Sequence, residues 1–362
     1  MKSLLFTVTN DLNYDQRMIR ICTSLQAAGY KVLLVGRRYG ASSPLQQRPF
    51  RQKRLFCFFK KGKLFYAEYN LRLLLYGLLK KFDLICAIDL DTILPCYLLS
   101  KIKGCKRVYD AHELFCEMKE IKTRPRIYKI WKWIEQKTVP KFESGYTVNS
   151  AIQQILKAEY GVDYAVVRNM PILKKTEPNS ISERYIIYQG AVNEGRSFET
   201  LIPAFAQING PLWIFGDGNF YEQAVQLTKQ SKLQHKVFFK GKLLPADLPE
   251  ATQGAVLGIT LFENTGLSNY YSLANRFFDY VHAGIPQLCV GYPVYDELNK
   301  QFEVAVLIDD LSVDSIATTI NKLLNNQTQL HTLRQNCLQA RETWNWQQEE
   351  KTLLCFYQTI FS

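Results

Sequence analysis

The feature that most constrains the fold is a repeated alternation of short apolar runs with helical segments. SLLFTVT (3–9), KVLLVGR (31–37) and FDLICAI (82–88) have the composition of buried strands, and helical segments follow the first and the third. RYIIYQG (184–190) and AVLGITLF (255–262) continue this pattern in the second half. Strands that alternate with helices pair in parallel, because each crossover helix returns the chain to the same edge. The sequence therefore predicts an α/β protein with two doubly wound, Rossmann-like domains.

The domain boundaries follow from composition. Residues 166–184 are rich in Pro, Ser, Asn and charge, which is typical of a linker. We therefore expect a first domain over 1–165 and a second over 185–342, which face a cleft where ligands bind at the carboxyl ends of strands. The last segment, 343–362, is expected to form an amphipathic helix that crosses back to the first domain.

Cysteine usage and hydropathy indicate the cellular compartment in which the protein works. Its nine cysteines are scattered singly, without a Cys-x-x-Cys pair, and many lie in apolar runs. This pattern favours buried, reduced thiols in a reducing compartment, without a zinc site or a disulfide framework. No apolar run reaches the length of a membrane span, and the N-terminus is expected to form a first strand instead of a signal peptide. We expect a cytoplasmic protein.

Charge is divided unevenly between the two halves. Residues 1–165 carry 29 lysines and arginines against 14 aspartates and glutamates, a balance of +15, whereas the remainder has a balance of −3. Such asymmetry suggests an anionic partner for the first half: anionic lipid, nucleic acid or a phosphorylated substrate. Nucleic acid is disfavoured because the sequence contains no recognised binding module.

One basic segment has a composition suited to a membrane interface. Within 121–142, lysines and arginines alternate with Ile127, Ile130, Trp131 and Trp133 on an expected helix. Basic residues that alternate with tryptophan favour the headgroup region of an anionic membrane. An exposed helix with one buried stripe would have the same pattern, and only the +15 balance favours the membrane.

Polar residues at strand ends are the candidates for chemistry in the first domain. AIDLD (87–91) has an Asp-x-Asp spacing that chelates Mn²⁺ in some sugar transferases, but the motif also begins a helix, where Asp91 or Thr92 would serve as N-cap. We therefore expect no metal site there. In YDAHEL (109–114), His112 follows a strand and would face the cleft, where it can hydrogen-bond a sugar hydroxyl. A structural histidine bonded to the backbone is an equal alternative.

Two glycine-containing turns are candidates in the second domain. Gly216 and Gly218 lie between a strand and a helix, where such a turn brings the backbone close to a phosphate or ribose, although a plain tight turn explains them equally well. In QGAVNEGRSFETLI (189–202), Gly190 ends a strand and Arg196 begins a helix, where a guanidinium can grip two oxygens of a diphosphate.

The segment 263–286 combines a polar loop with a short aromatic helix. Ser272 is the expected N-cap, Gly284 the expected left-handed C-cap, and Pro286 prevents continuation. Small and polar residues before the helix would leave backbone N–H groups free for an anion. Spacing places the polar helix residues on one face, within reach of the same anion. The candidate donor-binding residues of this segment are Gly266, Leu267, Ser268, Asn269, Ser272, Asn275, Arg276 and Asp279.

The chain resembles glycosyltransferase family 4 (group 1), which has the GT-B fold. The resemblance covers nearly the whole length, and its most specific part is SLANRFFDYVHAGIP (272–286). Other parts are 9–37, KRVYDAHEL (106–114), 188–202, WIFGDG (213–218) and VFFKG (237–241). It implies retention of configuration, a nucleotide diphosphate sugar as donor, and no metal or other cofactor.

Residue by residue, the resemblance implies a partly altered donor site. The family has two glutamates separated by seven residues, and the second of them binds the ribose. In this chain Tyr271 stands at the first position and Asp279 at the second. Arg196 matches the second member of the family's basic pair, and Ala191 replaces the first, so we expect Arg276 to supply that charge. His112 matches a family histidine near the transferred sugar. The family's N-terminal glycine-rich loop is replaced by residues 9–12, TNDL.

The sequence thus predicts a metal-independent glycosyltransferase, associated with the inner face of a membrane, that builds a polysaccharide or glycolipid. We expect His112, Arg196 and Arg276 to act in catalysis. The expected partners are a nucleotide sugar, a polysaccharide or lipid-linked acceptor and an anionic membrane surface, but no nucleic acid. A nucleotide-sugar epimerase of the same fold and a non-catalytic sugar-nucleotide binding protein are the alternatives.

Overall fold

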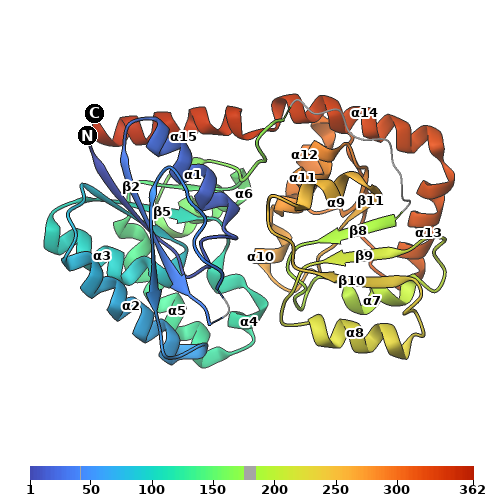
Figure 1. Cartoon of the computed structure of the whole chain (residues 1–362), viewed down its shortest axis with the longest axis horizontal. Coiled ribbons are helices and arrows are strands. Elements are labelled where there is room, and N and C mark those ends of the chain that lie inside the picture. The colour runs from blue at the N-terminus through green and yellow to red at the C-terminus, as the bar shows by residue number, and fades with distance from the viewer. Residues whose placement is uncertain (41, 175–184) are drawn as a thin grey trace. The chain divides into compact units, whose positions relative to one another are not determined.

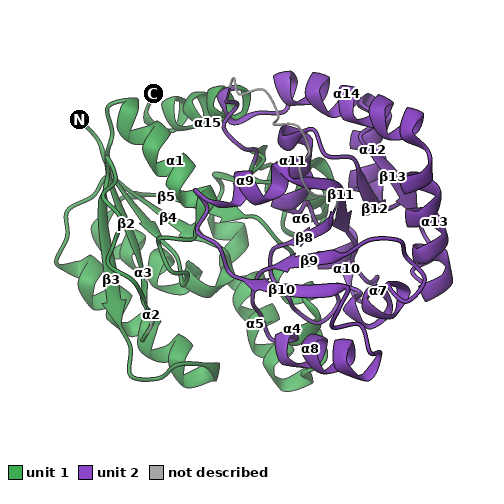
Figure 2. Ribbon diagram, turned by 45° about the vertical axis from the view of Figure 1, so that its right-hand side comes forward, with its two compact units in different colours: residues 1–169, 348–362 green, residues 170–347 purple. Residues whose placement is uncertain are grey.

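The chain forms two compact units, each built around its own parallel sheet (Figures 1 and 2). A computed structural model describes residues 1–40, 42–174 and 185–362. Unit 1 comprises Met1–Asn169 and Gln348–Ser362, and unit 2 comprises Met170–Gln347. Most of the expected linker, residues 175–184, lies outside the described residues.

Unit 1 contains a seven-stranded sheet in the order β3-β2-β1-β4-β5-β6-β7, and all the neighbouring strands pair in parallel. Its strands are β1 (Ser3–Thr7), β2 (Lys31–Arg38), β3 (Arg51–Phe56), β4 (Leu84–Ile88), β5 (Lys106–Ala111), β6 (Gly145–Thr147) and β7 (Ala165–Val166). Its helices are α1 (Gln16–Ala27), α2 (Gly62–Leu78), α3 (Ile93–Lys103), α4 (Lys119–Lys122), α5 (Pro125–Thr138) and α6 (Ser150–Tyr160), with 3₁₀ turns at Leu90–Thr92, Phe115–Glu117 and Val139–Lys141.

Unit 2 repeats this topology with six parallel strands in the order β10-β9-β8-β11-β12-β13. Its strands are β8 (Tyr185–Gln189), β9 (Leu212–Phe215), β10 (Val237–Gly241), β11 (Ala255–Thr260), β12 (Gln287–Val290) and β13 (Ala305–Ile308). Its helices are α7 (Phe198–Ala204), α8 (Tyr221–Gln230), α9 (Leu248–Gln253), α10 (Leu267–Tyr270), α11 (Asn275–Ala283), α12 (Pro293–Gln301), α13 (Val313–Asn325) and α14 (Gln327–Thr343).

Burial explains why these runs form central strands. Every residue of β4 and of β8 is buried, so both faces of each sheet are covered, as parallel sheets require. Helix ends have suitable capping residues: the Asp15 carboxylate caps α1 by accepting from the Met18 N–H, and Gly104 ends α3 in the left-handed conformation. The predicted pair of Rossmann-like domains is confirmed.

The strand order fixes where ligands can bind in each unit. In unit 1 the chain adds β2 and β3 on one side of β1 and then β4 to β7 on its other side. In unit 2 it adds β9 and β10 on one side of β8 and then β11 to β13 on its other side. Chains leave the carboxyl ends of the two central strands in opposite directions at such a switch point, which opens a crevice there. The candidate site residues should therefore follow β1 and β4 in unit 1, and β8 and β11 in unit 2.

The final helix, α15 (Trp346–Phe361), packs on the sheet of unit 1 through aromatic rings. Tyr357 is fully buried, with its ring 6.1 Å from Phe6 and 6.3 Å from Tyr146 between centroids. Seven of the nine cysteines are buried and Cys355 is exposed. None of the helices in the described part of the chain has the length and apolar character that a membrane span requires.

Candidate active site

Two guanidinium groups meet on one aromatic ring at the switch point of unit 2. Arg276, in the first turn of α11, lies 4.5 Å from the centroid of Phe262, and Arg196, just before α7, lies 4.4 Å from the same centroid. Phe262 follows β11 and is itself buried. The ring therefore holds two positive charges close together at the carboxyl end of the sheet, an arrangement that favours an anion.

Arg276 is the more deeply buried of the two arginines. It is 7% exposed, and its Nη1 donates to the Tyr188 hydroxyl at 3.2 Å. Its Nε and Nη2 are buried and have no hydrogen-bond partner among the described residues. Unpaired N–H groups on a buried cation are costly, so this guanidinium is poised to bind an anion.

Glycine is required where the β8 loop passes these side chains. Gly190 has a φ of +126°, and a Cβ there would lie 3.2 Å from Arg276 Nη1. Gly195 has a φ of +78°, and its Cβ would lie 3.1 Å from Asn269 Nδ2. The Asn269 side chain accepts from Arg196 Nη1 at 3.4 Å, so the loop after β8 and the turn before α11 are joined through this cluster.

Asp279 lies one turn after Arg276 on α11 and is oriented by the sheet. Its Oδ2 accepts from Gln189 Nε2 at 3.0 Å, and Gln189 Oε1 accepts in turn from the Thr252 hydroxyl at 2.7 Å. Gln189 is 1% exposed, whereas Asp279 is half-buried. Gln189 thereby fixes the orientation of the Asp279 carboxylate, which can accept hydrogen bonds but cannot donate them when ionised.

The polar loop before α11 only partly follows the sequence prediction. Ser272 does not cap α11, because the N-cap position is Ala274 and the Ser272 hydroxyl donates to Asn269 O at 2.8 Å. Gly284 is the left-handed C-cap, with φ of +68°. Asn275 is exposed while Arg276 is buried, so the two side chains point differently. The residues Gly266, Leu267 and Ser268 begin the short helix α10.

The turn after β9 is tight because two loops of the protein pack together. A Cβ on Gly216 would lie 1.8 Å from Gly190 O, and a Cβ on Gly218 would lie 2.3 Å from Val192 O. These glycines therefore allow close approach of the β8 loop, which is the plain structural alternative that the sequence left open.

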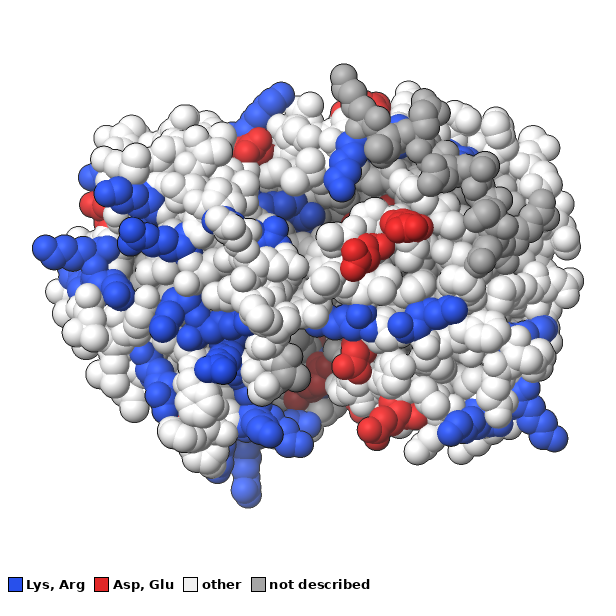
Figure 3. All heavy atoms as spheres, in the orientation of Figure 1, with Lys and Arg blue, Asp and Glu red and all other residues white. Residues whose placement is uncertain are grey.

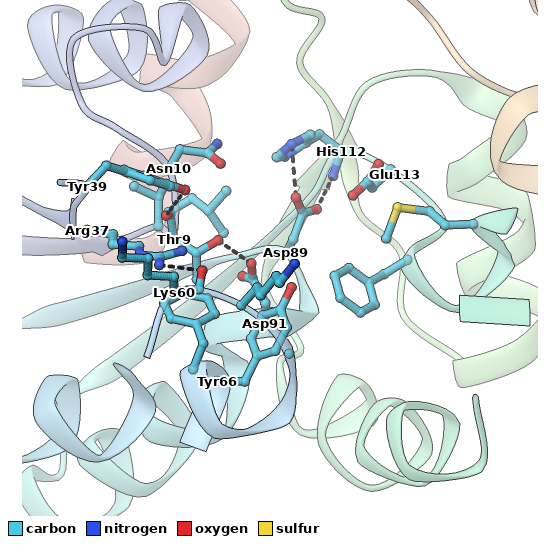
Figure 4. Close-up of a pocket in the computed structure, with 17 residues that line it drawn as sticks. Thr9, Asn10, Arg37, Tyr39, Lys60, Tyr66, Asp89, Asp91, His112 and Glu113 are labelled. Carbon is cyan, nitrogen blue, oxygen red and sulfur yellow. Dashed lines mark hydrogen bonds and ion pairs between the residues drawn. The ribbon is translucent and has the colours of Figure 1, made fainter. Parts of the chain in front are cut away.

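Unit 1 contains a cavity of about 410 Å³ at the ends of β1, β4 and β5 (Figure 4). The residues that line it are Val8, Thr9, Asn10, Arg37, Tyr39, Lys60, Lys61, Gly62, Phe65, Tyr66, Ile88, Asp89, Asp91, His112, Glu113, Phe115 and Met118. The predicted histidine thus lines a real cavity at the switch point, together with both aspartates of the Asp-x-Asp motif.

His112 is paired with Asp89 across the ends of β5 and β4. Its Nε2 lies 2.9 Å from Asp89 Oδ2, its backbone N–H donates to Asp89 Oδ1 at 3.3 Å, and its Nδ1 is buried without a partner among the described residues. Asp89 adopts a φ of +53°, a conformation disfavoured for residues with a Cβ. Burial alone would lower the pKa of His112, but Asp89, helped by Asp110, raises it to about 10.

Asp91 has a role different from the predicted cap. Thr92 occupies the N-cap position of α3 but makes no capping hydrogen bond, and Asp91 accepts from the Thr9 hydroxyl at 2.5 Å. Of the two predicted alternatives Thr92 therefore holds the cap position, whereas Asp89 and Asp91 line the cavity. Burial, reinforced by the charge of Asp89, raises the pKa of Asp91 to about 8.

The basic segment 121–142 is helical, but its residues face different surroundings. Trp131 is buried against the rings of Tyr66 and Phe115, whereas Trp133 is 57% exposed. Lys132 is engaged by Glu135 and Glu159. Trp131 is therefore occupied in the core and Lys132 in an ion-pair network, so Trp133 is the tryptophan of this segment that can contact a membrane, and membrane binding of the segment stays a prediction.

Comparison with known proteins identifies the family. The model described as "Glycosyl transferases group 1" matches residues 171–340, and that described as "Glycosyltransferase Family 4" matches residues 16–170. No curated protein sequence matches the chain significantly.

Solved structures share the fold at low sequence identity. Sucrose-phosphate synthase (tll1590) from Thermosynechococcus elongatus has 15% identity and a TM-score of 0.82, over 100% of this chain and 99% of that chain. Anabaena Alr3699/HepE in complex with UDP and glucose has 17% identity and a TM-score of 0.78, over 99% and 100%. WaaG, a glycosyltransferase involved in lipopolysaccharide biosynthesis, has 15% identity and a TM-score of 0.75, over 97% and 98%. With the two family models and the GT-B fold, the chain belongs to the group 1 glycosyltransferases of family 4.

Proposed function

We propose that this glycosyltransferase moves a sugar, with retention of configuration, from a nucleoside diphosphate to a polysaccharide or lipid-linked acceptor. The observation that carries the donor assignment is the pair of guanidinium groups on Phe262, one of which has two buried N–H groups without a partner among the described residues. A diphosphate supplies the charge and the oxygens that these groups lack.

In this proposal unit 2 binds the donor. Arg276 and Arg196 hold the diphosphate, and Asp279 accepts hydrogen bonds from the ribose hydroxyls. UDP is the first nucleotide to test, because the similar structure of Alr3699/HepE was solved with UDP and with UDP-glucose. Tyr271 stands where the family has an acid that touches the transferred sugar, so the donor sugar is to be found by screening.

Catalysis is proposed to rest on stabilisation of the departing diphosphate. The bond between the anomeric carbon and the diphosphate oxygen breaks as the acceptor oxygen attacks from the same face, and the departing phosphate takes the acceptor proton. The two arginines stabilise the charge that develops on that phosphate, which is often the largest contribution to catalysis. His112, charged at neutral pH because its pKa is about 10, donates from Nδ1 to the transferred sugar.

No metal is needed in this scheme, because the arginines supply the charge that a cation would otherwise provide. Among the described residues, no group of three or more His, Cys, Asp or Glu side chains is arranged to hold a metal ion. Because the two arginines supply this charge, we propose that neither a metal nor another cofactor takes part in the transfer.

Association with an anionic membrane is proposed for a face of unit 1 broader than the predicted segment. On α2, Leu64, Leu71, Leu75 and Leu78 are exposed at spacings that share one helix face, and Ile130 and Trp133 are exposed on α5. Lysines and arginines gather over the unit 1 part of the face in Figure 3. Exposed apolar side chains among basic ones suit the headgroup boundary of anionic lipid, at the inner face of the cytoplasmic membrane.

The testing experiment is a thermal-shift screen of UDP-, GDP- and ADP-linked sugars, followed by product analysis. A bound donor raises the apparent melting temperature, since it binds the folded state alone. Hydrolysis or transfer with release of the nucleotide supports the proposal. Interconversion of two nucleotide sugars would instead establish an epimerase, and tight binding without turnover a non-catalytic binding protein.

A further inference from the structure

The unit 1 cavity has a basic wall that the proposed transfer chemistry does not use. Arg37 near the end of β2, Lys60 and Lys61 before α2, and Gly62 at its start all line the cavity. Figure 4 shows Arg37 and Lys60 close to Tyr39 and separated from His112. Arg37 and Lys60 thus lie on one side of the cavity, and Glu113 and the ion pair of His112 with Asp89 lie on the other.

Arg37 is a buried cation, and the part of the chain that the structure describes supplies it with no counterion. It is 7% exposed, and its guanidinium lies 3.8 Å from the ring centroid of Phe65 and 4.4 Å from that of Tyr39. Nη2 donates to Lys60 O at 2.6 Å, but Nε is buried with no partner, and Arg37 forms no ion pair among the described residues. Burial of an unpaired charge is costly, so the site is incomplete without an anion.

The start of α2 adds a second source of positive potential. This helix has 17 residues, its N-cap Lys61 makes no capping hydrogen bond, and its first turn carries no acidic side chain. Gly62 has a φ of +75°, and a Cβ there would meet nothing within 4 Å, so the helix start is uncovered. The amide groups of an uncapped first turn and the helix dipole both favour an anion.

We propose that this wall binds a phosphate group of the acceptor, an inference that rests on the glycosyl transfer proposed above. A carboxylate binds an arginine best when its two oxygens accept from Nε and Nη2 together, but Nη2 of Arg37 already donates a hydrogen bond to Lys60 O. A phosphate has three outward oxygens, which match the Arg37 Nε, the ammonium groups of Lys60 and Lys61 and the amides of α2.

The carboxylates on the other side of the cavity are compatible with this ligand. The pKa of Asp91 is about 8, so its carboxyl group is mostly protonated at neutral pH. Asp89 is paired with His112. The acidic side thus presents acceptors for sugar hydroxyls, while the basic side neutralises the phosphate. The acceptor is accordingly a sugar or lipid that carries a phosphate near the hydroxyl group to be glycosylated.

The test measures phosphate binding with the donor site already filled. Calorimetric titrations of glucose 1-phosphate are made in saturating UDP, so that unit 2 contributes no free anion site. A parallel measurement uses phosphatidylcholine vesicles with and without a polyprenyl phosphate. The double variant Lys60→Ala/Lys61→Ala is compared with Lys31→Ala/Lys63→Ala, which loses the same charge from exposed lysines that do not line the cavity.

We expect the Lys60/Lys61 variant to weaken binding at least tenfold and the Lys31/Lys63 variant to weaken it less than twofold. Binding of glucose 1-phosphate indicates a soluble phosphorylated acceptor, and binding of the polyprenyl phosphate alone indicates a lipid-linked one. The proposal is overturned if neither probe binds, or if both variants weaken binding equally. UDP affinity is measured for every variant and is expected to stay unchanged, so a failure here is distinct from failure of the donor assignment.

Discussion

Replacing Arg276 by alanine is the sharpest test of the donor site, because it should affect ligand binding and protein stability differently. The substitution removes a buried guanidinium that has two N–H groups without a partner among the described residues. A charge-assisted hydrogen bond contributes about 1.5–3 kcal/mol. Loss of one such contact should weaken UDP binding roughly 10- to 150-fold, since each 1.4 kcal/mol is about tenfold.

The stability of the ligand-free protein should change little. Alanine loses the contacts of the guanidinium with the Tyr188 and Phe262 rings, each worth about 0.5–2 kcal/mol. It also removes the cost of the unpaired buried groups, about 1–3 kcal/mol, which acts in the opposite direction. The two contributions are of similar size, so we expect a folded protein with a melting temperature close to that of the wild type.

Thermal shifts with ligand then separate the two effects. At a UDP concentration 100 times the wild-type Kd, UDP stabilises the wild-type protein by about 2.7 kcal/mol. At the same concentration the variant should gain only about 0.3–1.4 kcal/mol, from the same relation with the weaker Kd. Calorimetry gives the Kd directly. Arg334→Ala, at a half-buried arginine of α14 outside the cluster, is the control and should bind UDP normally. A folded Arg276→Ala protein with UDP affinity within twofold of the wild type would refute the assignment.

Four other perturbations have defined outcomes. The pKa of His112 is raised from 6.5 to about 10, so its pairing with Asp89 stabilises the fold fully below about pH 6.5 and loses that effect as the pH rises through 10. His112→Ala should therefore lower the free energy of unfolding by about 1–3 kcal/mol at pH 6 and much less at pH 10.5, as measured with urea, and should reduce turnover without changing UDP affinity. Asp91 behaves oppositely, because burial raises the pKa of an acid and makes its ionised form costly. Asp91→Asn should raise the free energy of unfolding by about 1–3 kcal/mol at pH 9 and have little effect at pH 4; an equal effect at both pH values would show that ionisation is not the cause. Leu71→Ser/Leu75→Ser should weaken binding to anionic vesicles in a flotation assay, whereas Trp131, which is buried, should show no blue shift on binding. EDTA should leave transfer activity largely unaffected, and activity that is lost with EDTA and restored by Mn²⁺ would contradict the metal-independent scheme.

Much of the fold could be predicted because its signals are local. Apolar runs of seven or eight residues and a helix-end glycine such as Gly284 act within a few residues, and the structure has a strand within each run and a left-handed cap at Gly284. The N-cap of α11 could not be predicted in this way. Ser272 can cap a helix or bond to a nearby carbonyl, and its hydroxyl donates to Asn269 O.

Only part of the candidate site could be predicted from the sequence, because its residues contact one another across long sequence separations. Arg276 could be selected from its helix face, but the ring of Tyr188, 88 residues away, holds it in place. Likewise, nothing local in KVLLVGR indicates that Arg37 would be buried between Phe65 and Tyr39. The arginine after an apolar strand and the two lysines before a helix were the only available signals, and both are common on exposed surfaces.

The return of α15 to unit 1 has a consequence for synthesis of the chain. Unit 2 is a continuous segment, Met170–Gln347, inserted between two parts of unit 1. A ribosome therefore completes unit 2 while unit 1 still lacks the helix that covers Phe6 and Tyr146 with Tyr357. Unit 2 can fold first, whereas unit 1 stays incomplete until the last residues emerge. Chains shortened before α15 should consequently expose the sheet of unit 1 and be recognised as unfinished by chaperones and proteases, even though unit 2 is complete.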